Sequence, residues 1–148
     1  MENKMEIKIL ADLRNVATVR VAISSFISNL KITVDDMVYV KTAVSEAVTN
    51  SIEHGYVNDN LENFVYIKAY IKSDDEDKIK IEIIDNGVGI EDISLAMTPE
   101  YTTKPEEEHA GMGFTIMESF MDEVIVDSKK DGGTKITLLK TLKTRKSL

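Results

Sequence analysis

The first thirty residues carry two different hydrophobic patterns. Apolar and polar residues alternate from Met5 to Leu10, as expected for a strand with one buried face. From Val16 onward the apolar residues lie three or four positions apart, which is the period of an amphipathic helix. The positions concerned are Val19, Ile23, Phe26 and Leu30. We therefore expect a strand followed by a helix.

A second helix is predicted to begin after Thr33. Thr33 and Asp36 form a carboxylate variant of the capping box, in which the first side chain accepts a backbone N–H of the first turn. The helical run continues to His54. Gly55 follows it, at a position where a left-handed helix terminus favours glycine.

Two strands are predicted in the middle of the chain. Phe64–Ile71 and Ile79–Ile84 are rich in branched and aromatic residues and flank the acidic turn Asp74–Asp77. They are therefore expected to pair antiparallel. The two prolines, Pro99 and Pro105, both fall between regular patterns, which predicts a loop there.

The C-terminal part begins with a short predicted helix, Gly113–Phe120. A closing hairpin follows, with strands Glu123–Val126 and Thr134–Leu139 joined through Asp131–Gly133. Most strands come late, and the helices can pack on one side of them. The pattern predicts an α+β fold, a two-layer α/β sandwich.

Composition limits the class of protein. The chain has 148 residues, 43% of them hydrophobic, which suits a single domain over residues 1–148. It has no cysteine and no apolar run near the roughly 20 residues that span a bilayer, so we expect a cytoplasmic protein without membrane contact. The net charge of −8 argues against direct nucleic-acid binding. Residues 140–148 form a basic tail that we expect to be solvated.

Three polar residues recur at four-residue spacing on the second predicted helix: Glu46, Asn50 and His54. Such residues lie along one stripe and can face one pocket. An Asn amide oxygen suits Mg²⁺, and a carboxylate can accept the proton of an attacking hydroxyl. Small residues that would let a ligand come close lie beside the stripe, at Ala43, Ala47 and Ser51. The alternative is a solvated polar face.

A second candidate group follows the strand Ile79–Ile84. Asp85 shares strand parity with the isoleucines, so its carboxylate should point inward and needs a partner there. The exocyclic amine of adenine could be that partner, with Gly87 and Gly89 allowing close approach of the backbone. The alternative is an ordinary Asp-Asn-Gly turn.

A third group is the sequence Gly111-Met112-Gly113 at the start of a predicted helix. Helix N-termini bind anions, and glycines let the backbone wrap phosphate oxygens. The glycines follow no first strand of a parallel βαβ unit, which excludes a Rossmann site, and no Walker motif occurs. Gly132-Gly133-Thr134, which opens the last strand, by itself predicts only a hairpin.

Together, these four groups resemble, in order and approximate spacing, the N, G1, G2 and terminal Gly-Thr boxes of the GHKL superfamily of ATPases and kinases. The resemblance is greatest to the serine-kinase anti-sigma factors of spore-forming bacteria, and it covers nearly the whole chain. The segments that carry it are Ser45–Ser51, Thr102–Pro105, Gly111–Glu118 and Phe120–Val126. The fold implied is the Bergerat type, with a mixed sheet covered on one face by helices.

The resemblance implies ATP and Mg²⁺ as cofactors and assigns roles to individual residues. Glu46 would be the general base, Asn50 would hold Mg²⁺, and Asp85 would bind adenine with support from Thr134, through water. Further nucleotide contacts are implied for Gly87 and Gly89 in the base pocket, for Gly111, Met112 and Gly113 at the phosphates, and for Thr103 and Lys104 in a lid over residues 98–110. Where the family commonly has Arg-Ser before Gly-Met-Gly, this chain has His109 and Ala110.

The function implied is that of a homodimeric protein serine/threonine kinase. It would sequester a sporulation sigma factor and phosphorylate a serine of an anti-anti-sigma protein. The first strand and first helix would build the dimer and partner surface, with Arg20 contacting a partner. Two alternatives remain open: a related stress-response anti-sigma kinase, and a nucleotide-dependent binding module without phosphoryl transfer.

Overall fold

The computed structural model describes residues 2–55, 63–90, 93–97 and 112–142. Its strands form a sheet in the order β1-β2-β3-β5-β4, in which every neighbouring pair is antiparallel. The strands are β1 Glu2–Leu10, β2 Phe64–Ser73, β3 Asp77–Asp85, β4 Glu123–Ser128 and β5 Thr134–Leu142. The antiparallel pair and the closing hairpin predicted from the sequence are confirmed, with strands slightly longer than expected.

The expectation of a mixed sheet is wrong for the described strands. β3 and β4 run in the same direction, because both are antiparallel to β5, and the segment between them is long enough for a parallel crossover. However, β5 lies between them in the sheet. The two strands that share a direction are therefore not neighbours, and no parallel pair forms among the described strands.

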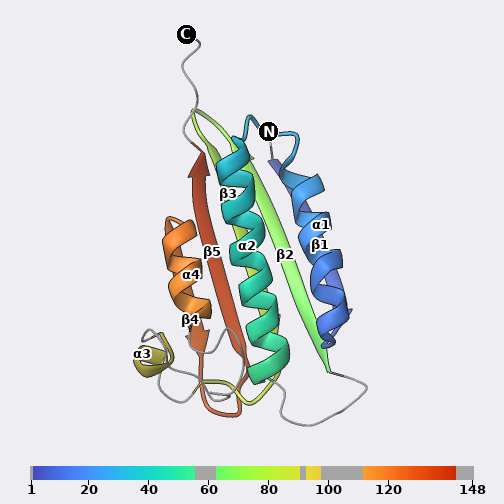
Figure 1. Cartoon of the computed structure of the whole chain (residues 1–148), viewed down its shortest axis with the longest axis vertical. Coiled ribbons are helices and arrows are strands. Elements are labelled where there is room, and N and C mark those ends of the chain that lie inside the picture. Colours follow the sequence, from blue (N-terminus) through green and yellow to red (C-terminus); the bar gives the residue numbers. More distant parts are fainter. Residues whose placement is uncertain (1, 56–62, 91–92, 98–111, 143–148) are drawn as a thin grey trace.

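The helices lie on one face of the sheet (Figure 1), which confirms the two-layer α+β arrangement. The central helix α2, over the middle of the sheet, lies between α1 and α4. The helical elements are η1 Leu13–Asn15, α1 Val16–Ile27, α2 Val34–Asn50, the π-helical turn η2 Ser51–Gly55, α3 Ile93–Ala96 and α4 Gly113–Phe120. Among the described residues, no helix is both long and apolar enough to cross a membrane.

The core fills the space between the sheet and its helices. Alternate residues of β2 and β3 are fully buried under the helices, which is the strand parity predicted from the sequence. The helices contribute the apolar stripes expected for their period. The largest fully buried side chains include Ile67, Ile81, Ile83, Leu138, Val19, Ile23, Val40 and Val44.

The opposite face of the sheet carries charged and aromatic side chains. The Lys8 ammonium lies 4.1 Å from the centroid of the Phe64 ring, and the Lys80 ammonium lies 5.3 Å from that of Tyr70. Such contacts let long cationic side chains cover aromatic surface while their charge stays in water.

The expectation of a solvated tail over residues 140–148 is wrong for residues 140–142, which belong to β5. The Lys140 ammonium donates a 2.9 Å hydrogen bond to the carbonyl oxygen of Phe120 and lies 3.7 Å from the Asp36 carboxylate. A cation paired in this way is part of the packing between β5, α2 and α4. Residues 143–148 lie outside the described residues.

Candidate functional site

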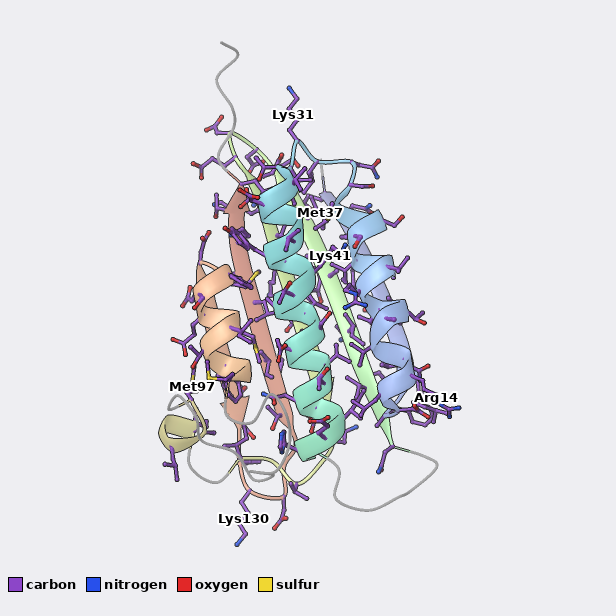
Figure 2. All side chains as sticks on the ribbon, in the orientation of Figure 1. Arg14, Lys31, Met37, Lys41, Met97 and Lys130 are labelled. Carbon is purple, nitrogen blue, oxygen red and sulfur yellow. The ribbon has the colours of Figure 1, made fainter. Side chains whose placement is uncertain are left out.

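Four segments that are distant in the sequence meet at one end of the molecule. They are the C-terminal end of α2, the C-terminal end of β3, the start of α4 and the turn between β4 and β5 (Figure 1). Figure 2 shows Lys130 at the tip of that turn and Met97 beside α3, both at this end. These segments hold the sequence-predicted site residues that the structure describes, apart from Arg20.

The cap of α2 determines where this helix begins. The Asp36 N–H donates to the Thr33 hydroxyl at 3.0 Å, as the capping pattern predicts. Glu46 and Asn50 follow on one side of the helix, both partly buried. The α-helix ends at Asn50 and continues as a π turn, a feature that is frequent at functional sites. The His54 imidazole lies in that turn, 3.9 Å from the Glu53 carboxylate.

One expectation about α2 is wrong. Ala43 and Ala47 were expected beside a ligand, but both are fully buried in the hydrophobic core. Their small size instead suits the packing of α2 between the sheet and the helices on either side of it.

Asn50 lies against the start of α4. A Cβ atom added to Gly113, the first residue of α4, would lie 3.3 Å from both the Oδ1 and the Nδ2 atom of Asn50. Met112 occupies the N-cap position and makes no side-chain hydrogen bond to the first turn. The backbone N–H groups of that turn therefore lie beside the Asn50 amide without a side-chain cap, which is the arrangement that an anionic ligand can use.

Asp85 is buried at the end of β3 and directly opposite Thr134 of β5. Burial raises the pKa of its carboxyl above the ordinary value, while hydrogen bonds donated by the backbone N–H groups of Gly87 (2.9 Å) and Thr134 lower it in part. The inward direction predicted from strand parity is thus confirmed. A buried carboxyl held by backbone donors can accept a hydrogen bond from a ligand amine.

The Ser51 side chain, which was expected beside a ligand for its small size, also brings a hydroxyl group to the site. The residue is only 3% exposed, and its hydroxyl lies near enough to the Asp85 carboxyl to lower the pKa of that carboxyl. The hydroxyl oxygen nevertheless has no hydrogen bond of acceptable geometry within the described structure. A buried hydroxyl without a partner is costly, so this position suits a ligand or a water molecule that supplies one.

The loop after β3 is fixed by the turn between β4 and β5. The Gly133 N–H donates to the Gly87 carbonyl oxygen at 3.2 Å, and the Asp131 N–H donates to that of Val88. Gly89 has a φ of +73°, and a Cβ atom there would overlap the carbonyl oxygen of Lys129. The backbone contact that requires a glycine at position 89 is therefore made within the protein, between the loop after β3 and the turn between β4 and β5.

We predict that Gly89→Ala lowers the free energy of unfolding by at least about 2 kcal/mol, because alanine disfavours a positive φ and its Cβ displaces the neighbouring turn. Gly132→Ala is the matched control, since the three atoms nearest to its Cβ would all belong to the flexible Lys129 side chain. Urea unfolding of both variants measures the difference. Equal stability of the two variants would contradict this role of Gly89.

Several expected site residues fall outside the described residues: Thr103, Lys104, Gly111 and the whole of the predicted lid 98–110, including His109. Within the described part of the chain, no group of three or more His, Cys, Asp or Glu side chains could hold a metal ion. A surface hollow lies at the opposite end of the sheet, near Tyr70 and Leu139, away from the predicted site residues.

Arg20 lies apart from this end group, on the exposed side of α1. Its neighbour Val21 is 66% exposed, although it is a large apolar residue. The Arg20 carbonyl oxygen accepts a 2.8 Å hydrogen bond from the Ser24 hydroxyl within the helix. Arg20 is thus an exposed residue of α1 that does not belong to the group of site residues at the end of the molecule.

Comparison with known proteins agrees with this arrangement. Residues 9–140 match the family model of the histidine kinase-like ATPase domain, so the chain carries an ATPase domain of that class. The chain is 50% identical over 139 residues to the anti-sigma F factor of Clostridium beijerinckii, covering 94% of each chain. It is 49% identical over 144 residues to that of Clostridium perfringens, covering 97% of this chain and all of the relative. The chain belongs to the anti-sigma F factor family.

Solved structures give the same fold at lower identity. The RsbU and RsbW domains of a Mycobacterium tuberculosis protein superpose with a TM-score of 0.68 at 20% identity, covering 99% of this chain and 35% of that one. The histidine kinase domain of an Erythrobacter litoralis blue-light activated histidine kinase gives 0.52 at 16% identity, covering 86% and 59%. At these identities the likeness concerns the fold alone.

Proposed function

We propose that this chain is an ATP-dependent anti-sigma factor. It sequesters a sporulation sigma factor when nucleotide is bound, and it transfers the terminal phosphoryl group of ATP to a serine of an anti-anti-sigma protein. The observation that carries the proposal is the meeting of two pairs at one end of the fold, Asn50 with Gly113 and Asp85 with Thr134. The Asn50–Gly113 pair suits the phosphates of a nucleotide, and the Asp85–Thr134 pair suits its base.

The adenine base is recognised at the Asp85 end. The Asp85 carboxylate accepts a hydrogen bond from the exocyclic amine, and Thr134 supports this contact through water. The buried Ser51 hydroxyl near the Asp85 carboxyl supports this assignment, since a polar ligand edge or its water could hydrogen-bond to it. Gly87 and Gly89 form the adjoining wall of the base pocket.

The phosphates lie at the start of α4. Gly111, Met112 and Gly113 offer backbone N–H groups there, and Thr103 and Lys104 belong to the lid over residues 98–110. Mg²⁺ would be held by the Asn50 amide oxygen and by the phosphates, and would neutralise their charge. A single protein ligand is consistent with Mg²⁺, which keeps several waters and takes few ligands from the protein.

Transfer itself needs a proton acceptor near the phosphates. Glu46 lies one helical turn before Asn50, so both side chains reach the same side of α2. Glu46 accepts the proton of the substrate serine hydroxyl as the bond from that oxygen to the terminal phosphorus forms and the bond to the leaving ADP oxygen breaks. This makes the chain a protein serine/threonine kinase.

The partner surface is separate from the nucleotide site. The chain acts as a homodimer in which β1 and α1 supply the dimer and partner contacts, with Arg20 binding a partner. We predict that Arg20→Glu lowers ATP-dependent capture of the sigma factor by at least about 30-fold, since a reversed charge at an interface repels its former partner. ATP affinity should not change, because Arg20 lies outside the pocket.

Lys31→Glu is the matched control for Arg20→Glu, because it makes the same charge change at an exposed residue between α1 and α2 (Figure 2). A pull-down of the sigma factor at several salt concentrations, together with calorimetric titration of ATP, measures both effects. Equal losses of capture in the two variants would remove Arg20 from the partner surface.

The test of the whole proposal uses the purified chain with radiolabelled ATP, a sporulation sigma factor and a candidate anti-anti-sigma protein. Capture of the sigma factor only with ATP, and label on a serine of the anti-anti-sigma protein, are the expected results. Capture without any label transfer would instead favour a nucleotide-dependent binding module. Failure to bind ATP at all would overturn the proposal.

A further inference from the structure

Ser128, the last residue of β4, has an unusual set of hydrogen bonds. It lies opposite Thr134 in the sheet, and it is partly buried. Its hydroxyl accepts from the Ile90 N–H at 2.8 Å, donates to the Gly133 carbonyl oxygen at 2.9 Å, and lies 2.7 Å from the Thr134 hydroxyl. One side chain thereby joins the loop after β3, the turn before β5 and the start of β5.

The number of protons settles the direction of the last contact. A serine hydroxyl has one hydrogen to donate and two lone pairs to accept with. The carbonyl oxygen of Gly133 can only accept, so it takes the Ser128 proton, and the Ile90 N–H occupies one lone pair. In the arrangement that satisfies all three contacts, the Thr134 hydroxyl therefore donates to the second lone pair of Ser128. The proton of the Thr134 hydroxyl is then engaged with Ser128, and only the lone pairs of the Thr134 oxygen remain to accept a further hydrogen bond.

We propose that Ser128 is a positioning residue that holds the Thr134 hydroxyl as a hydrogen-bond acceptor beside Asp85, and thereby selects a purine with an amino group at position 6. The inference rests on the proposed ATP site. Thr134 and Asp85 lie directly opposite each other on the core side of the sheet, and both are buried. Side chains in such a pair project together from the same face.

The selectivity follows from the hydrogen-bond pattern. An ionised Asp85 carboxylate and a Thr134 oxygen held by Ser128 are both hydrogen-bond acceptors. The ligand edge that faces them, directly or through a water that donates to both, therefore has to be a donor. The 6-amino group of adenine is a donor, whereas the 6-carbonyl group of inosine is an acceptor. Without Ser128 the Thr134 hydroxyl can rotate and donate, and the penalty against the carbonyl decreases.

The experiment compares binding of ATP and ITP to the full chain by calorimetric titration. Ser128→Ala should lower ATP affinity by about tenfold, the size of one or two lost hydrogen bonds, and should reduce the ratio of ATP to ITP affinity by at least about threefold. Ser128→Thr keeps the hydroxyl and should restore both values. Ser119→Ala is the matched control, because Ser119 is exposed and its hydroxyl donates to the Thr115 carbonyl oxygen within α4.

A double-mutant cycle separates positioning from a general loss of structure. In a Thr134→Val background, Ser128→Ala should leave the ATP-to-ITP ratio unchanged, since there is no hydroxyl left to orient. An unchanged ratio in Ser128→Ala alone would overturn the proposal, whatever happens to ATP affinity. If Ser128→Ala does not fold, Ser128→Cys gives the same comparison with a weak donor. Wild-type protein that binds neither nucleotide would overturn the ATP site itself.

Discussion

Glu46→Gln is expected to reduce phosphoryl transfer by about 10²–10⁴-fold while leaving capture of the sigma factor intact. The amide keeps nearly the same shape as the carboxylate but cannot accept the proton of the substrate hydroxyl. Asn50 and Asp85 are untouched, so ATP affinity should stay within about twofold of wild type. In the proposed function, sigma capture uses the surface near Arg20 in the nucleotide-bound protein, and this surface takes no part in the transfer step.

Two measurements on each protein decide this prediction: a phosphotransfer time course and an ATP-dependent pull-down of the sigma factor. Glu118→Gln is the matched control, because Glu118 is an exposed carboxylate on α4 and its substitution is the same chemical change. Normal transfer by a folded Glu46→Gln protein would remove the general-base role. Loss of sigma capture in the same variant would show that transfer and sequestration are not separable.

Asp85→Asn is expected to weaken ATP binding by about 10- to 100-fold, because the ligand amine loses a charged acceptor worth roughly 1.5–3 kcal/mol. The same change should not destabilise the protein without nucleotide. Burial raises the pKa of Asp85, so the folded state holds the ionised carboxylate at a cost. Asparagine carries no charge and avoids that cost.

The sign of the pH dependence follows from the same shift. A carboxyl with a raised pKa in the folded state opposes folding once it is ionised, and this opposition disappears as the pH falls through the raised pKa. Unfolding of the apo wild type should therefore show a stabilising contribution on acidification that Asp85→Asn lacks.

Calorimetric titration with ATP and urea unfolding at a series of pH values measure both effects of Asp85→Asn. Asp127→Asn is the control, since Asp127 is an exposed carboxylate on β4. ATP affinity equal to wild type in folded Asp85→Asn would take Asp85 out of the adenine site. A variant much less stable than wild type at neutral pH would contradict the cost assigned to the buried charge.

Local patterns in the sequence were sufficient for the elements and for the direction of one key side chain. Thr33 with Asp36 identified the start of α2, and Gly113–Phe120 was predicted with the bounds that α4 has. The parity of Ile79, Ile81 and Ile83 placed Asp85 on the buried face of β3. These features depend on residues within a few positions of each other, where the periods of helix and strand apply directly.

Partnerships between distant segments required the tertiary structure. Strand order is one case: the mixed sheet was expected from the family resemblance, and nothing local to β3 or β4 says that β5 lies between them. Lys140 is another, since its place in a basic run suggested solvent, whereas its partners Asp36 and the Phe120 carbonyl come from other elements. Periodicity predicts which face of an element is buried, but not which other element packs against that face.

The sequence by itself determined the family, the elements, and the residue types available for base, phosphate and proton chemistry, because each motif is short and local. Only the tertiary structure decided which groups meet: Asn50 against Gly113, Ser51 beside Asp85, and Ser128 bonded to Thr134. Ser128 carries no sequence signal of its own, since serine is common in helices, strands and turns alike, and Ser51 was expected beside a ligand only for its small size. A hydroxyl becomes informative only when burial limits its partners and each hydrogen bond has to be accounted for.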